Sequence, residues 1–340
     1  MVKAVWMLSL LACLAGCQTW PGRIEAEQWQ NYRQNFITPE GRVIDNANGG
    51  VSHSEGQGYG MLLAVSADDG ETFQRLWHWT QTHLAIREDG LFAWRWDPSV
   101  EGGISDRNSA TDGDLLIAWA LSRAARHFGN DRYRQHASEI IRSLRHTVAR
   151  ETPMGSVLLP GAFGFEVENG VILNPSYFIF PAYAELATLD DAPYWIGLAR
   201  QNAALLENLQ RYYTGFIPDW TLLGDRGWQA PPGLPHRFGY DALRVPLYLC
   251  WGGERVATSM AEIEAYWKGS DARAWIALDG TEERASYPPG DAHRAVQRLL
   301  QSCLGARSEF QSIISPLPED YYAATLTLLA QIAWQERFRQ

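Results

Sequence analysis

The 340-residue chain contains no run of lysines and arginines, no low-complexity tract and no obvious linker. Its 39 acidic residues outnumber its 29 basic ones, which gives a formal net charge of −10. Nucleic acids and anionic membrane surfaces attract basic patches, so this charge argues against both as partners. With 46% hydrophobic and 20% charged residues, the composition is globular, and the length fits one large domain or two smaller ones.

Cysteine is scarce, and two of the four cysteines belong to residues 1–17. The other two, Cys250 and Cys303, could form a disulfide in an exported protein or remain buried thiols. No two cysteines have the spacing of a zinc site. His136 and Glu139 form an isolated pair that is more typical of a helix surface. The sequence therefore predicts no metal site and no cofactor.

Residues 1–17 have the features of an export signal. Lys3 supplies a positive charge, and residues 4–14 form an apolar run too short to span a bilayer. The ending Leu-Ala-Gly-Cys17 resembles a bacterial lipoprotein signal, in which cleavage leaves Cys17 as the lipidated N-terminus; a conventional cleavage site nearby is the alternative. We expect an exported, periplasmic protein, anchored to the outer membrane if Cys17 is lipidated, with one domain over residues 18–340.

Apolar residues recur at helical spacing along most of the chain. About eleven helices are expected, over residues 24–35, 55–66, 72–86, 108–128, 133–149, 174–189, 194–213, 241–251, 260–268, 292–303 and 321–338. Two of them, at 115–125 and 326–334, are apolar on more than one face, which is typical of helices enclosed by others. Strands are expected to be few and short. This pattern predicts an all-α fold, a closed toroid of inner helices inside more amphipathic outer ones.

The segment at residues 108–128, NSATDGDLLIAWALSRAARHF, places Asp112 and Asp114 in the first turn of an amphipathic helix. Ser109 and Thr111 are candidate N-caps. Acidic residues are favourable at any helix N-terminus. Taken alone, this segment therefore favours a structural role for both aspartates.

Glu55 is followed by three closely spaced glycines, Gly56, Gly58 and Gly60. Ser52 and Glu55 have the spacing of a capping box, which would make Glu55 a structural residue. However, each glycine destabilises a helix by roughly 1 kcal/mol relative to alanine. Three of them indicate close approach of the backbone to another segment or to a ligand, which favours a functional site.

Asp241 follows a Pro/Gly-rich loop at residues 231–237 and precedes an apolar segment. Pro246 fits only near a helix start, which places Asp241 at or just before the first turn. In a toroid, the starts of inner helices gather at one rim, so Glu55, Asp112 and Asp241 are expected in one cleft. Glycosidic hydrolysis needs such a set: one protonated carboxyl to assist the leaving oxygen and one carboxylate to activate water. Clustering and partial burial would raise the pKa of one acid and leave another low.

Aromatic residues are abundant, with 15 tryptophans and 14 tyrosines. In polar loops their flat faces can stack on sugar rings as well as on each other. Trp94 and Trp96 flank Arg95 in such a loop, although core packing explains either tryptophan equally well. Tyr177 and Tyr240 are expected to accompany the three acids in the cleft.

Four segments, taken in order, resemble the motifs of glycoside hydrolase family 8. They are SEGQGYGM at 54–61, ATDGD at 110–114, NPSY at 174–177 and YDALR at 240–244. RVID at 42–45 and PDW at 218–220 make the chain most similar to the periplasmic endoglucanases of bacterial cellulose-synthase operons. The resemblance spans roughly residues 28–338.

This resemblance implies an (α/α)6 barrel and a cellulase that hydrolyses internal β-1,4-glucosidic bonds with inversion. By motif, Glu55 resembles the general acid, Asp241 the general base and Asp112 the aspartate that binds the distorted sugar. An inverting mechanism needs no covalent nucleophile, and its acid and base are expected roughly 6.5–9.5 Å apart. The helix start is expected to keep Asp112 ionised. For Asp114 we expect a structural contact beneath the cleft.

The resemblance also implies which residues contact substrate. They are Trp94, Tyr177, Tyr240, Arg244, Gln57, Tyr59 and, as a weaker candidate, Tyr322. The expected partner is a β-1,4-glucan chain, with a cellulose synthase or export complex as a further candidate and a monomer as the expected state. Two features depart from the family pattern: the lipoprotein-like Cys17, and Pro246 in a helix that is usually uninterrupted.

Two alternatives remain open at this point. A hydrolase of the same family could act on chitosan, mixed-linkage β-glucan or xylan, and subsite residues decide between them. A non-catalytic glucan-binding assembly factor on the same scaffold would predict loss of an acid. Glu55 and Asp241 are both present, which favours the hydrolase.

Overall fold

The computed structural model describes residues 22–254, 260–306 and 316–339. The predicted export signal and Cys17 lie outside the described residues. Within the described ranges, none of the helices combines the length and the apolar character that crossing a membrane requires.

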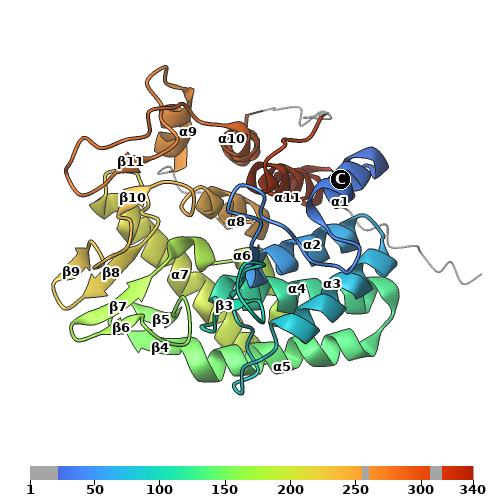
Figure 1. The fold of residues 1–340 in the computed structure, drawn as a ribbon. Helices are drawn as coiled ribbons and strands as arrows, with labels where there is room; N and C mark the ends of the chain where they lie inside the picture. The colour runs from blue at the N-terminus through green and yellow to red at the C-terminus, as the bar shows by residue number, and fades with distance from the viewer. Residues whose placement is uncertain (1–21, 255–259, 307–315, 340) are drawn as a thin grey trace, which may run out of the picture.

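Helices make up most of the described structure (Figure 1). They are α1 (Ala26–Phe36), α2 (Ser54–Ser66), α3 (Gly70–His83), α4 (Thr111–Phe128), α5 (Asp131–Val148), the 3-10 helix η1 (Pro175–Tyr177), α6 (Phe180–Leu186), α7 (Ala192–Tyr212), α8 (Arg244–Gly252), α9 (Met260–Lys268), α10 (Asp291–Cys303) and α11 (Tyr321–Phe338). Ten of the eleven expected helices are therefore confirmed, with boundaries that shift by a few residues, and the one expected over residues 174–189 is divided.

Five helices are buried on nearly all sides: α2, α4, α6, α8 and α11. In this set α2 contacts α4, α4 contacts α6, α6 contacts α8, and α11 contacts both α8 and α2, which closes a ring. The amphipathic helices α3, α5 and α7 pack on the outside of α2, α4 and α6, and α10 packs against α8 and α11. In the described residues, five inner helices enclosed by outer ones close a ring, the toroid of inner and outer helices that the sequence predicts for an (α/α)6 barrel.

The ring is tight where α2 meets α4. A Cβ atom added to Gly58 would lie 2.6 Å from the Cβ of Leu116, and one added to Gly113 would lie 2.1 Å from the Oγ of Ser54. Real side chains do not approach so closely, so only glycine fits at these positions. The predicted close approach of the backbone is confirmed, and it brings the starts of α2 and α4 together.

Across the residues that the structure describes, short strands form four small sheets in the loops between helices. They are β1 (Ser52–His53), β2 (Arg95–Trp96) and β3 (Ile104–Asp106); β4 (Ala149–Thr152) and β5 (Gly155–Leu158); β6 (Glu166–Val167), β7 (Gly170–Leu173), β8 (Thr221–Gly224) and β9 (Gly227–Gln229); β10 (Arg237–Phe238) and β11 (Ile276–Ala277). Strands of two to four residues are too short to show a hydrophobic period, so individual strands could not be predicted. The first sheet matters for the site because it pairs the residues before α2 with the loop that carries Trp94.

The helix expected over residues 174–189 is divided into η1 and α6. Asn174 caps η1 by accepting a hydrogen bond from the backbone N–H of Ser176 (3.0 Å). Pro181 lies in the first turn of α6, where its missing N–H is tolerated. The two prolines, Pro175 and Pro181, therefore mark two separate helix starts.

The predicted N-caps of α4 are wrong. Thr111 Oγ1 donates to the carbonyl of Leu159 (2.5 Å), and Ser109 Oγ accepts from the N–H of Ala162 (3.0 Å). The N-cap residue is Ala110, which has no side chain to cap with. Both hydroxyls instead tie the start of α4 to the loop after β5.

Cys250 in α8 and Cys303 at the end of α10 form a disulfide, with their Cα atoms 6.0 Å apart. The sequence left open a disulfide or two buried thiols, and the structure has the disulfide. It joins inner helix α8, which begins beside Asp241, to α10.

Candidate active site

A cavity of about 430 Å³ opens where α2, α4 and α8 begin. Its wall contains Glu55, Asp112 and Asp241, so the predicted gathering of the three acids at one rim is confirmed. Other wall residues include Trp94, Phe165, Tyr177, Trp220 and Arg244. Aromatic faces and carboxyls therefore share one concave surface, which is typical of a carbohydrate site.

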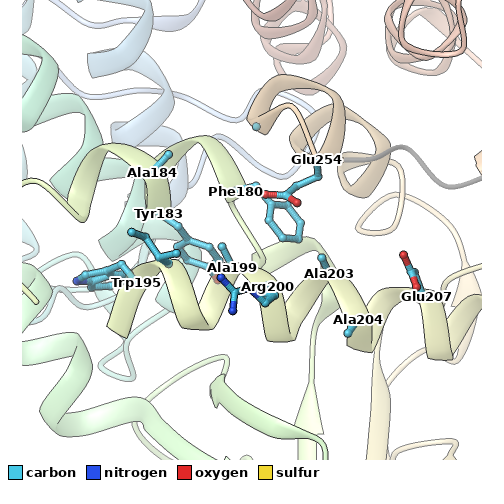
Figure 2. Close-up of a pocket in the computed structure, with 12 residues that line it drawn as sticks. Phe180, Tyr183, Ala184, Trp195, Ala199, Arg200, Ala203, Ala204, Glu207 and Glu254 are labelled. Carbon is cyan, nitrogen blue, oxygen red and sulfur yellow. The ribbon is translucent and has the colours of Figure 1, made fainter. Parts of the chain in front are cut away.

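A larger hollow, of about 550 Å³, lies elsewhere, between α6 and α7 (Figure 2). Phe180, Tyr183 and Trp195 contribute aromatic surface there, with Arg200 and Glu207 along α7. None of the predicted site residues lines it. The smaller cavity with the three acids is therefore the candidate active site.

Glu55 is the second residue of α2 and is not used to cap the helix. Ser52 Oγ donates to the carbonyl of Val43 (2.5 Å), so the predicted capping box does not form. Glu55 Oε1 instead accepts hydrogen bonds from the hydroxyl of Tyr59 (3.1 Å) and from Nη1 of Arg244. The capping-box explanation of Glu55 is therefore wrong.

Arg244, the first residue of α8, connects the three acids and is only 3% exposed. Its Nη2 donates to Oδ1 of Asp241 (2.8 Å) and to Oγ of Ser176 (2.7 Å). Its Nη1 donates to Glu55 and lies 3.8 Å from Oδ2 of Asp112. One guanidinium thus holds Glu55 and Asp241 on different nitrogens and offsets part of the charge of all three carboxyls.

Asp241 lies in the turn before α8, three residues ahead of Arg244, as Pro246 predicted. Its side chain remains 33% exposed to the cavity. Burial among the cavity walls and, to a smaller extent, the neighbouring carboxyl of Asp219 together raise the pKa of Asp241 to about 7. The raised pKa expected for one of the clustered acids is therefore found at this residue.

Asp219 fixes the turn that carries Asp241. Its Oδ1 accepts from the backbone N–H groups of Gly239 (3.1 Å) and Ala242 (2.8 Å), and its Oδ2 accepts from Nε of Arg237 (3.1 Å). Asp219 is 1% exposed. The sequence pointed to this residue only as part of a matching motif, and its structural role was missed.

Asp112 is buried at the start of α4, where its Oδ1 accepts from the N–H of Gly113 (2.8 Å). Burial raises the pKa of Asp112 well above its usual value, and the charge of Asp241 acts in the same direction. This shift is opposite to the expectation that the helix start keeps Asp112 ionised. A helix N-terminus contributes roughly 0.3–1 kcal/mol, less than one pKa unit, whereas desolvation can contribute several units.

Tyr177 and Asp114 occupy the surroundings of Asp112. Burial and the neighbouring Asp112 raise the pKa of the Tyr177 hydroxyl, so that hydroxyl stays protonated as a donor. Asp114 is fully buried, and its Oδ1 accepts from the N–H of Phe92 (2.9 Å). Its structural contact beneath the cleft is confirmed, because that bond holds the loop of Trp94.

Gln57 does not reach the cavity, so its predicted contact with substrate is wrong. The side chain is fully buried; Oε1 accepts from the N–H of Val43 (2.7 Å), and Nε2 donates to Gly41 O (3.1 Å) and Thr80 Oγ1 (3.0 Å). Gln57 therefore ties α2 to α3 and to the segment before β1.

Tyr59 is also buried, at 1% exposure, and does not line the cavity. Its hydroxyl lies 3.1 Å from Glu55 Oε1 and 2.6 Å from the hydroxyl of Tyr248. It supports Glu55 from behind and does not face substrate, which corrects the prediction.

Tyr240 and Tyr322 line a separate hollow of about 440 Å³, and neither lines the cavity of the three acids. The hydroxyl of Tyr240 pairs with that of Tyr287 (2.9 Å), and the hydroxyl of Tyr322 donates to the carbonyl of Tyr240 (2.5 Å). The structure therefore places these two tyrosines beside the cavity of the three acids and not in its wall, and their contact with the sugar stays a prediction.

Three further wall or support residues were missed. Phe165 and Trp220 stack with ring centroids 5.8 Å apart and planes 8° apart, and Ser176 holds Arg244. Trp220 and Ser176 lie inside motifs that the sequence did identify, whereas Phe165 lies in a loop with no pattern. Over the described residues, no group of three or more His, Cys, Asp or Glu could hold a metal ion.

We expect kcat/KM to fall as the pH drops below about 7, because Asp241, if it is the predicted general base, must be ionised to accept a proton from water. Below this pKa the ionised fraction falls about tenfold per pH unit, and kcat/KM reports groups of the free enzyme. The measurement is kcat/KM on soluble cellulose from pH 4 to pH 9. An acidic limb that stays near the ordinary aspartate pKa would contradict the assignment.

The model of glycosyl hydrolases family 8 matches residues 1–336. A probable endoglucanase of Novacetimonas hansenii is 39% identical over 319 residues, which are 92% of this chain and 91% of that protein. The crystal structure of endoglucanase Cel10 from Klebsiella pneumoniae, at 37% identity, superposes with a TM-score of 0.81 over 91% of this chain and 99% of that one. The structure of endo-β-1,4-glucanase CMCax from Acetobacter xylinum, at 36% identity, superposes with a TM-score of 0.82 over 92% of this chain and 98% of that one. The chain therefore belongs to glycosyl hydrolase family 8, as its four motifs predicted.

Proposed function

We propose that the protein is an endo-β-1,4-glucanase that hydrolyses internal bonds of cellulose with inversion. The observation that carries this proposal is the cavity in which Arg244 binds Glu55 and Asp241 on different nitrogens beside Asp112. Similar proteins named as endoglucanases support the reaction class.

In the proposed reaction, Glu55 donates its proton to the glycosidic oxygen as the bond to the leaving sugar breaks. The carboxylate that forms is stabilised by Tyr59 and Arg244, which already contact Oε1. Asp241 accepts a proton from the water that attacks the anomeric carbon. A base with a pKa of about 7 takes that proton readily near neutral pH.

Asp112 and Tyr177 are proposed to bind the sugar that is distorted at the bond cleaved. A raised pKa lets the carboxyl of Asp112 stay protonated and donate a hydrogen bond to a sugar hydroxyl. The wall aromatics Trp94 and Trp220 offer faces for neighbouring glucosyl rings. The nucleophile is water, so no covalent intermediate forms.

The test is a set of hydrolysis assays on carboxymethyl cellulose, mixed-linkage β-glucan, chitosan and xylan. We expect the highest kcat/KM on carboxymethyl cellulose and a product of inverted, α-configuration when anomers are followed by NMR in the first minutes. A β-product would exclude inversion. Higher kcat/KM on another polymer would move the proposal to that substrate, and no release of sugar from any of the four would favour a non-catalytic binding protein.

We also propose export to the periplasm, with Cys17 as a lipid anchor to the outer membrane. The support is the sequence of residues 1–17 and the Leu-Ala-Gly-Cys ending. From this location a monomeric enzyme would trim cellulose as a synthase or export complex secretes it. Radioactive palmitate should label the wild type and not a Cys17→Ser variant; equal labelling of both would exclude the anchor.

A further inference from the structure

His53 lies in the wall of the candidate active site, directly against Trp94. The two rings are stacked, with centroids 5.9 Å apart and planes 9° apart. His53 ends strand β1, where it pairs with Arg95, and it is followed by Ser54, whose N–H donates to the carbonyl of Trp94 (3.0 Å). Both rings line the same cavity as Glu55, which is two residues further along the chain.

The imidazole of His53 acts as a neutral aromatic ring. Its side chain is only 14% exposed, and burial lowers the pKa of His53 to about 4, with Arg95 and Arg244 acting in the same direction. The carboxyl of Asp45 lies 4.0 Å from its Nε2. At neutral pH a stacked, uncharged ring is therefore the group that Trp94 meets.

The backbone of Trp94 is held on both sides of the residue. Its N–H donates to the carbonyl of Asn108 (2.8 Å), and two residues earlier the N–H of Phe92 donates to the buried carboxyl of Asp114 (2.9 Å). These bonds fix the backbone of Trp94 but do not by themselves set the orientation of its indole. The stacked ring of His53 restricts that orientation.

We infer that His53 is a positioning residue for substrate binding: it backs one face of Trp94 so that the other face is presented to a glucosyl ring. The inference rests on the proposed function. An indole that is already ordered loses less conformational entropy when a sugar binds. Because aromatic pairs contribute modestly to stability, removing the stack should weaken binding by about three- to tenfold. Proton transfer by Glu55 and Asp241 should be unaffected.

Four variants test this: His53→Ala, His53→Phe, Trp94→Ala and the double variant that combines His53→Ala with Trp94→Ala. With carboxymethyl cellulose, His53→Ala should raise KM about three- to tenfold and keep kcat within about twofold, and His53→Phe should restore KM because phenylalanine keeps the stack. In the Trp94→Ala background, the change at His53 should add almost nothing, since the two residues act as one unit.

A loss of kcat at constant KM, failure of the phenylalanine variant at an unchanged melting temperature, or full additivity with Trp94→Ala would each overturn the inference. The same changes are also measured by calorimetric binding of cellohexaose in the Glu55→Gln background, where no turnover is needed. An unchanged Kd after His53→Ala there overturns the inference even if the wild type proves inactive. A wild type that binds cellohexaose without hydrolysing it contradicts the proposed function alone.

Discussion

Replacing Glu55 by glutamine is expected to lower kcat on carboxymethyl cellulose by about 10²–10⁴-fold, the range that a general acid contributes. Glutamine has the same shape and can still accept hydrogen bonds from Tyr59 and Arg244, but it has no proton to give to the leaving oxygen. Replacing Asp241 by asparagine should cause a loss of similar size, because water then lacks its base. The measurement is release of reducing sugar, with circular dichroism and melting temperature to show that the fold is unchanged.

The two losses differ with the leaving group, which separates the roles of acid and base. In a dinitrophenyl β-cellotrioside the leaving group is dinitrophenolate, which departs without protonation. Glu55→Gln should therefore recover most of its activity on this substrate. Asp241→Asn should stay inactive, because water must still be activated. If Asp241→Asn recovers activity on this substrate and Glu55→Gln does not, the roles of acid and base are exchanged. Normal turnover of carboxymethyl cellulose by either variant would show that the replaced residue has no part in the mechanism.

The sequence predicted the fold and the gathering of the acids because both depend on patterns that are local in the chain. Helices that are apolar on more than one face must be enclosed, and enclosed helices that alternate with amphipathic ones form a ring. The glycines after Glu55 predicted close backbone contact, and the space at Gly58 shows why no side chain is tolerated there. Pro246 placed the start of α8 correctly for a comparable reason: it fits only in a first turn.

The errors concern directions and environments that a motif does not specify. Glu55 and Gln57 stand two residues apart in one motif, yet on a helix this spacing turns them to different faces. Glu55 shares its face with Tyr59, one turn later, and the two are hydrogen-bonded, while Gln57 points to α3. The pKa of Asp112 is raised mainly by burial, which involves segments distant in the sequence. The favourable position at a helix start was therefore not enough to predict whether this pKa is raised or lowered.

Replacing Arg244 by methionine is expected to lower kcat by at least about 10²-fold and to move the acidic limb of kcat/KM above pH 7. Without the guanidinium, the carboxylate of Asp241 loses the cation that contacts it at 2.8 Å, and loss of an opposite charge raises the pKa of a carboxyl. Asp241 is then protonated at neutral pH and cannot act as a base. Loss of the buried cation should also reduce stability by roughly 3 kcal/mol, less in so far as water screens the partly exposed Glu55 and Asp241.

Arg244→Lys is the matched control because it keeps the positive charge and loses the planar guanidinium with its two separate nitrogens. A lysine ammonium is a single point of charge and cannot hold two carboxyls on separate nitrogens in one plane. We therefore expect Arg244→Lys to leave the acidic limb close to that of the wild type while kcat still falls, since the acid and base are no longer held in register. The pH profiles of kcat/KM for wild type, lysine and methionine variants decide the matter. If the methionine variant keeps the wild-type limb, the charge of Arg244 does not set the ionisation of Asp241, and the guanidinium serves geometry alone.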